Sequence, residues 1–133
     1  MADRPRRLRV LLVEDSNEIR ESLALLLLDE GIDVVATGLG AAALKLAPRL
    51  GADVILTDLG LPDIPGLALI RHLLRILRPR PRIIVVTGFG EPYLSQAREA
   101  GADVVFTKPL AWETLRQHLR RVAARGRRRG TAA

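Results

Sequence analysis

The sequence contains no cysteine and very few aromatic residues, and these shortages limit the kinds of cross-link, metal site and core that the protein can form. Without cysteine there is no disulfide bond and no thiolate metal site, which fits a reducing compartment. Aromatic residues make up 3% of the chain, so the core must consist of Leu, Val, Ile and Ala. No uninterrupted apolar run approaches bilayer length, and the charged start lacks the apolar segment of a signal peptide. We therefore expect a cytoplasmic protein with no membrane insertion.

Positive charge is unevenly distributed along the chain. The net charge is +6, and arginines gather at both ends. The apolar content of 48% is enough for one domain with one core. We expect a basic N-terminal arm over residues 1–7, a domain over 8–124 and a basic, disordered tail over 125–133. No aromatic residue lies between the tail arginines, which argues against nucleic acid as a partner.

Short apolar runs alternate with amphipathic segments along the whole chain. Strands are expected at 8–13, 32–36, 53–57, 83–86 and 103–106, and helices at 16–30, 40–50, 65–77, 91–100 and 110–124. Each strand is apolar throughout, which is typical of a parallel sheet covered by helices on both faces. We therefore predict an α/β fold, a five-stranded doubly wound parallel sheet of order 2-1-3-4-5 with five helices.

Polar residues follow the predicted strands, and Asp58 is the most informative of them. It ends the apolar run that begins after Gly51. Glu14 and Asp15 follow the first strand, Thr87 follows the fourth and Lys108 follows the fifth. Because parallel strands end at the same edge of a sheet, we expect these side chains to meet in the crevice where such folds bind ligands.

This set of side chains indicates phosphoryl transfer. Three neighbouring carboxylates cannot all stay ionised without a counter-charge, and a set of oxygen ligands favours Mg²⁺. Neither histidine falls at this edge, so zinc is disfavoured. A carboxylate nucleophile, a metal, the Lys108 ammonium and the Thr87 hydroxyl are what phosphoryl transfer to Asp58 requires. Alone, Glu14 and Asp15 would be interpreted as helix-capping residues.

The motifs, in this order, resemble those of the receiver domains of two-component response regulators, from about residue 8 to 122. The matching segments are Val13-Glu14-Asp15, Thr57-Asp58-Leu59-Gly60-Leu61-Pro62 with Gly66, Val86-Thr87-Gly88 and Thr107-Lys108-Pro109.

The resemblance implies that Asp58 accepts a phosphoryl group from a histidine kinase or a histidine phosphotransfer protein. It implies Mg²⁺ held by Asp15, Asp58 and the Gly60 carbonyl, with Glu14 acting through water. Thr87 and Lys108 would contact the phosphoryl group, and the bond from Lys108 to Pro109 would be cis. The expected chemistry is self-phosphotransfer and autodephosphorylation, not turnover as an enzyme. We expect a stand-alone receiver, a monomer or weak homodimer, that signals by contact with a downstream protein.

One position departs from the family pattern. Receivers usually carry Tyr or Phe three residues before the lysine, and the rotamer of this aromatic side chain depends on the position of the threonine. Here that residue is Val105, and the ring of Phe106 should point to the opposite face of the strand. A β-branched valine has little room to swing, so we expect any response to run through the loops after the third and fourth strands.

Three alternatives remain open at this stage. The chain resembles hybrid-kinase receivers in its Asp58 and Thr87 segments, which would make it a relay intermediate between histidines. The Arg-rich tail would allow nonspecific nucleic-acid binding modulated by phosphorylation. An aspartate-nucleophile phosphatase of the haloacid-dehalogenase type would need a second aspartate where Gly60 stands, which disfavours that class.

Overall fold

The computed structural model describes residues 6–131 of the chain, and its centre is a parallel sheet. The strands are β1 (Arg9–Val13), β2 (Asp33–Thr37), β3 (Val54–Thr57), β4 (Arg82–Thr87) and β5 (Val104–Thr107). They pair in the order β2-β1-β3-β4-β5, every pair parallel. The predicted fold class and strand order are thus confirmed.

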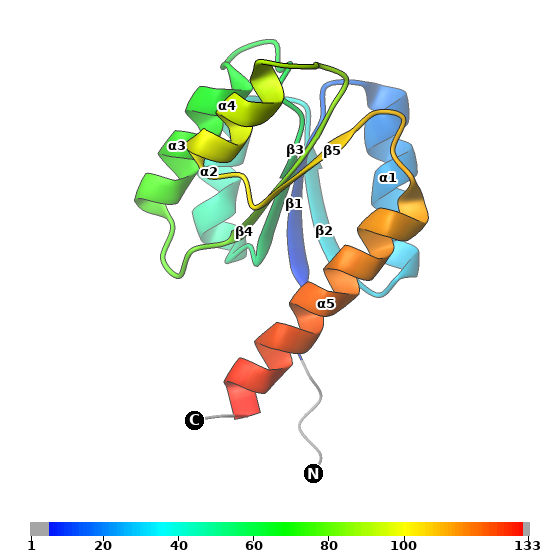
Figure 1. Cartoon of the computed structure of the whole chain (residues 1–133). Coiled ribbons are helices and arrows are strands. Elements are labelled where there is room, and N and C mark those ends of the chain that lie inside the picture. Colours follow the sequence, from blue (N-terminus) through cyan, green and yellow to red (C-terminus); the bar gives the residue numbers. More distant parts are fainter. Residues whose placement is uncertain (1–5, 132–133) are drawn as a thin grey trace.

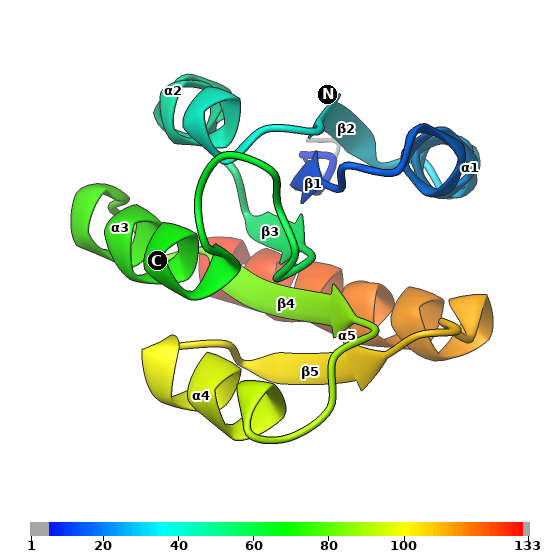
Figure 2. The same cartoon turned by 90° about the horizontal axis from the view of Figure 1, so that it is seen from above.

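Five helices cover the two faces of this sheet (Figure 1). They are α1 (Asn17–Asp29), α2 (Gly40–Leu50), α3 (Gly66–Ile76), α4 (Tyr93–Ala100) and α5 (Trp112–Thr131). Seen from above, α1 and α5 lie on one face, and α2, α3 and α4 lie on the other (Figure 2). The doubly wound arrangement leaves β1 and β3 as central neighbours, which is the switch point of this fold.

The buried residues form two clusters, one on each side of the sheet. Leu11 and Ile55 pack with α2, α3 and α4, whereas Val10 and Leu56 pack with α1 and α5. Adjacent strand residues therefore enter different clusters, because successive side chains point to opposite faces. Helices bury both faces of the sheet, and for this reason the central strands are continuous apolar runs in the sequence.

The last helix extends beyond its predicted end. The sequence predicted a helix ending at residue 124 and a disordered tail over 125–133, but the backbone is helical to Thr131. Arginine and alanine are good helix formers, and the isolated glycines Gly126 and Gly130 do not interrupt the helix. Residues 132–133, like residues 1–5 of the predicted basic arm, lie outside the described part. Within residues 6–131, no helix is both long enough and apolar enough to span a bilayer.

Candidate functional site

The two central strands bring Glu14 and Asp58 side by side. Val13 and Thr57 are register partners, so the residues that follow them are neighbours at the carboxyl edge of the sheet. The Asp58 backbone N–H donates to the Val13 carbonyl at 3.1 Å. Glu14 is 4% exposed and Asp58 is 8% exposed. Two carboxylates so close and so buried require a positive partner.

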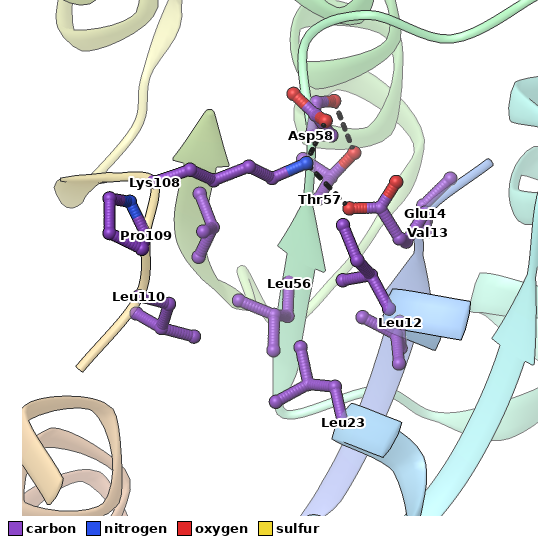
Figure 3. A pocket seen from close by; sticks show the side chains of 12 residues that line it. Leu12, Val13, Glu14, Leu23, Leu56, Thr57, Asp58, Lys108, Pro109 and Leu110 are labelled. Atoms are coloured by element: carbon purple, nitrogen blue, oxygen red, sulfur yellow. Dashed lines mark hydrogen bonds and ion pairs between the residues drawn. The ribbon is translucent and has the colours of Figure 1, made fainter. Parts of the chain in front are cut away.

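Lys108 supplies that positive partner (Figure 3). Its Nζ donates to Glu14 Oε1 at 2.8 Å and to Asp58 Oδ2 at 2.7 Å. The lysine comes from the loop after β5, where its backbone N–H donates to the Thr87 carbonyl at 2.8 Å. The following bond to Pro109 is cis, as the resemblance implied. One ammonium therefore joins the ends of β1 and β3 to the loop after β5.

The surroundings of Lys108 keep it charged. Burial lowers the pKa of its ammonium, but the hydrogen bonds and negative charges of Asp58 and Glu14 oppose burial and raise that pKa above its ordinary value. The side chain thus remains a cation throughout the neutral range. Its ammonium is close enough to Asp58 to pair with negative charge that is added there.

Asp58 has its other oxygen fixed by the backbone of its own loop. Oδ1 accepts from the Leu59 N–H at 2.6 Å and from the Gly60 N–H at 3.3 Å. The loop is compact because the start of α3 lies against it. A Cβ at Gly66 would meet the Leu59 Cα at 2.4 Å, so only glycine fits there. The carboxylate is therefore oriented before any ligand arrives.

The predicted metal ligands lie together at this edge. Glu14, Asp15 and Asp58 each offer a carboxylate oxygen, and these oxygens lie within 4.8 Å of one another. The set is all oxygen and includes the exposed Asp15, which suits a hard cation that keeps several waters. Glu14 Oε2 also accepts from the Ser16 N–H at 3.1 Å. The carboxylates therefore fit Mg²⁺, whereas the part of the Gly60 carbonyl stays a prediction.

Thr87 ends β4 and is fully buried. Its Oγ1 accepts from the Phe89 N–H at 3.1 Å. Among the described residues, it makes no hydrogen bond with Asp58. The hydroxyl thus lies at the same edge of the sheet, but in this structure it is engaged with its own loop.

The side chains at positions 105 and 106 point to opposite faces of the sheet, as the strand pattern predicts. Val105 packs with the cluster under α2, α3 and α4, and Phe106 packs with the cluster under α1 and α5. The ring of Phe106 also contacts His118 edge-on, with centroids 6.1 Å apart. Phe106 therefore does not replace an aromatic side chain at position 105.

Sequence reasoning missed one residue beside the site, Asp63, and left open whether Phe89 flanks the site entrance or faces a partner. The carboxylate of Asp63, in the loop after β3, accepts from the Gly40 and Ala41 N–H groups at 2.9 Å each. These bonds lower the pKa of Asp63 and cap α2, whose own cap residue lacks a side-chain bond. Phe89 covers Gly60 from the loop after β4. Neither contact follows from local sequence, because the partners are more than twenty residues apart.

A mainly apolar pocket of about 500 Å³ lies beneath the charged cluster (Figure 3). Leu12, Leu23 and Leu56 are among the residues that line it, with Asp58 and Lys108 at its polar end. The pocket places low-dielectric walls under the ion pairs, which strengthens electrostatic interactions there.

Comparison with known proteins identifies this arrangement of residues. Residues 10–120 match the model of the response regulator receiver domain. The chain belongs to this family. As a receiver, it is 37% identical over 117 residues to the sensory transduction protein RegX3 of Mycolicibacterium smegmatis, covering 88% of this chain and 51% of that protein. It is 32% identical over 121 residues to the cell cycle response regulator CtrA of Brucella ovis, covering 90% and 52% respectively.

Solved receivers share its fold. The BeF3-activated receiver domain of Klebsiella pneumoniae RstA superposes with a TM-score of 0.80 at 26% identity, covering 86% of this chain and 97% of that chain. Vibrio cholerae chemotaxis protein CheY4 gives 0.79 at 29% identity, covering 88% and 99%. The receiver spans about half the length of the curated relatives. These comparisons favour none of the alternatives, neither relay intermediate, nucleic-acid binder nor phosphatase.

Proposed function

We propose that this receiver accepts a phosphoryl group on Asp58 from a histidine kinase or a histidine phosphotransfer protein. It then signals in the cytoplasm by contact with a downstream protein, as a monomer or weak homodimer. The observation that carries the proposal is the Lys108 ammonium, which bridges Asp58 and Glu14 at 2.7 and 2.8 Å. A carboxylate held this way can act as a nucleophile beside a ready counter-charge.

The transfer itself needs little beyond positioning and charge stabilisation. A carboxylate oxygen of Asp58 attacks phosphorus, and the bond from phosphorus to the donor imidazole nitrogen breaks with its electron pair leaving to the imidazole. The backbone N–H groups of Leu59 and Gly60 hold the carboxylate in orientation. Lys108 keeps its positive charge and stabilises the added negative charge, and the Thr87 hydroxyl is available to donate to a phosphoryl oxygen.

Glu14, Asp15, Asp58 and the Gly60 carbonyl are the groups that would hold Mg²⁺. The bound ion would neutralise charge on the transferring phosphoryl oxygens. The carboxylates support this role because oxygens of all three lie within 4.8 Å of one another, whereas Lys108 pairs with Glu14 and Asp58. No separate substrate is turned over in this account, since the chain modifies itself and hydrolysis of the acyl phosphate restores it.

Acetyl phosphate tests the proposal without a cognate kinase. With Mg²⁺, we expect intact-mass spectrometry to show one added phosphoryl group that hydroxylamine removes. Asp58→Asn should gain none. Asp53→Asn is the matched control, because Asp53 directly precedes the same strand at the opposite edge and should not affect labelling. Equal labelling of Asp58→Asn and the parent chain would refute the proposal.

A further inference from the structure

Val105 leaves this receiver without a swinging ring on β5. The valine is partly buried against the cluster of the α2, α3 and α4 side, and its branched Cβ leaves χ1 little freedom. The chain has four aromatic residues in all, two of them phenylalanines. A signal from Asp58 therefore has to leave the site through another group that touches it.

Phe89 is such a group, and its ring lies on the loop that follows Asp58. A Cβ built on Gly60 would lie 3.2 Å from the Phe89 Cζ, so the ring rests directly over that glycine. The same ring pairs with Tyr93 at the start of α4, with centroids 5.1 Å apart. Both side chains are exposed, at 43% and 47%. The ring of Phe89 thus connects the loop after Asp58 to the solvent-facing start of α4.

The backbone of Phe89 is attached to the site as well. Its N–H donates to Thr87 Oγ1 at 3.1 Å, and Thr87 is completely buried. A hydroxyl that accepts one bond still has a proton to donate. If that proton turns to a phosphoryl oxygen on Asp58, the oxygen that holds Phe89 moves with it. Phe89 is thus coupled to the site at two points, Thr87 through its main chain and Gly60 through its ring.

The loop around Phe89 has room for such a movement. Gly88 and Gly90 flank the residue, and a Cβ added to either would meet no atom within 4 Å. Both glycines are exposed, as Phe89 is. The segment can therefore change position without disturbing the buried core. In the present structure, the contacts of the Phe89 ring with Gly60 and Tyr93 hold the loop in place.

We propose that Phe89 is the readout residue of this receiver. Phosphorylation of Asp58 draws Thr87 toward the phosphoryl group, lifts the Phe89 ring from Gly60 and rearranges its pair with Tyr93. The exposed surface of Phe89 and Tyr93 then reports the state of Asp58 to a partner protein, without rotation of the side chain at position 105. This inference rests on the proposed phosphorylation of Asp58.

NMR of chain labelled at Phe and Tyr tests the inference, because the few rings give few signals. The phosphoryl group is added with acetyl phosphate and Mg²⁺, and its presence is followed by intact mass in the same sample. We expect loss of the nuclear Overhauser contact between the Phe89 ring and Gly60, and a shift of the Tyr93 ring signals. Phe106 is the internal control, since it packs on the other face of the sheet and should not shift.

Two variants separate the possible outcomes. Asp58→Asn should show neither added mass nor ring movement. Phe89→Leu keeps the N–H that Thr87 accepts but removes the ring, so it should gain the phosphoryl mass with the Tyr93 shift lost. Added mass with the Phe89–Gly60 contact intact would overturn the readout proposal alone. Failure of the parent chain to gain mass would overturn both the proposed function and this inference.

Discussion

The two edges of the sheet carry carboxylates in opposite situations. At the amino edge, where strands begin, Asp33, Asp53 and Asp103 each form an ion pair with arginine. At the carboxyl edge, where strands end, the Lys108 ammonium pairs with Glu14 and Asp58, and a carboxylate oxygen of Asp15 lies within 4.8 Å of theirs. The residue types are alike, but their balance with positive charge is not.

At the amino edge, Asp53 and Asp103 accept hydrogen bonds from the backbone as well as from arginines. Asp53 Oδ2 accepts from the Arg9 N–H at 2.8 Å, and Asp103 Oδ2 accepts from the Ile83 N–H at 2.7 Å. Each aspartate thereby closes the gap between the starts of two neighbouring strands. Such fully partnered carboxylates hold the fold together and have no unmet demand for a ligand.

The contrast between the edges indicates that function follows from uncompensated charge, and not from the presence of charged residues alone. Negative charge in excess over its partners costs stability, and it persists where a metal or a transferred group completes it. The carboxyl edge of this receiver has that excess and the amino edge does not. Substitutions at the two edges should therefore affect different measurements.

The largest effect is expected from Lys108→Ala. Removing the ammonium that bridges the carboxylates of Asp58 and Glu14 takes away the charge stabilisation of transfer, so labelling by acetyl phosphate should slow by about 100-fold. The matched control at the amino edge is Arg80→Ala, which breaks the ion pair with Asp103 and should leave the rate unchanged. Equal slowing in both variants would remove the distinction between the edges.

Asp53→Ala should reverse the pattern. It removes the acceptor of the Arg9 N–H and the partner of Arg6, and the free energy of unfolding should fall by about 1–2 kcal/mol. Urea denaturation measures the loss. Labelling of the folded variant should match that of the parent. A stable but unlabelled variant would show that the amino edge takes part in the chemistry.

Asp15→Asn should have a smaller effect, and of the opposite sign. Without Mg²⁺, neutralising one carboxylate of the crowded edge should raise the free energy of unfolding by roughly 0.5 kcal/mol, a small gain because Asp15 is exposed. Added Mg²⁺ should stabilise the parent more than the variant. Thermal unfolding with and without Mg²⁺ checks both statements. Identical stabilisation by Mg²⁺ would count against Asp15 as a ligand.

The smallest effect concerns His118, which accepts from Arg82 Nε at 3.3 Å near the amino edge. Burial, then the charges of Arg82, Arg121 and Arg125, lower the pKa of His118 below its ordinary value of 6.5, against a weaker opposing effect of Asp103. The unfolded chain thus takes up this proton at higher pH. The contribution of His118 to stability should be complete above pH 6.5 and should fall as pH drops through the lowered folded pKa.

His118→Gln should flatten that part of the curve of unfolding free energy against pH. Urea denaturation at a series of pH values measures the slope in the parent and the variant. His72→Gln is the matched control, because His72 is exposed on α3. A slope that His118→Gln leaves unchanged would assign the pH dependence to other groups.

The fold was predictable because its signals are local. β1 and β3 are buried on both faces and so appear in the sequence as unbroken apolar runs, and the strand order followed from the parallel arrangement. The convergence of Glu14, Asp58 and Lys108 followed from their places after those strands. The end of α5 was predicted wrongly because isolated glycines among helix formers, here Gly126 and Gly130, are weak stop signals.

Contacts between loops were beyond the reach of the sequence. Asp63 caps α2 across 23 residues, and its own segment gives no sign of that partner. The contact of the Phe89 ring with Gly60 was equally unpredictable, because it depends on how the loops after β3 and β4 pack against each other. The engagement of the Thr87 hydroxyl with its own loop likewise depends on the conformation of the following residues.

The most direct test of the account asks which carboxylate receives the phosphoryl group. The chain is treated with acetyl phosphate and Mg²⁺, then with borohydride, which reduces an acyl phosphate to the alcohol, and the peptides are sequenced by tandem mass spectrometry. We expect the reduced side chain at Asp58 and at no carboxylate of the amino edge. Reduction at Asp53 or Asp103, or at Asp15 in place of Asp58, would contradict the account.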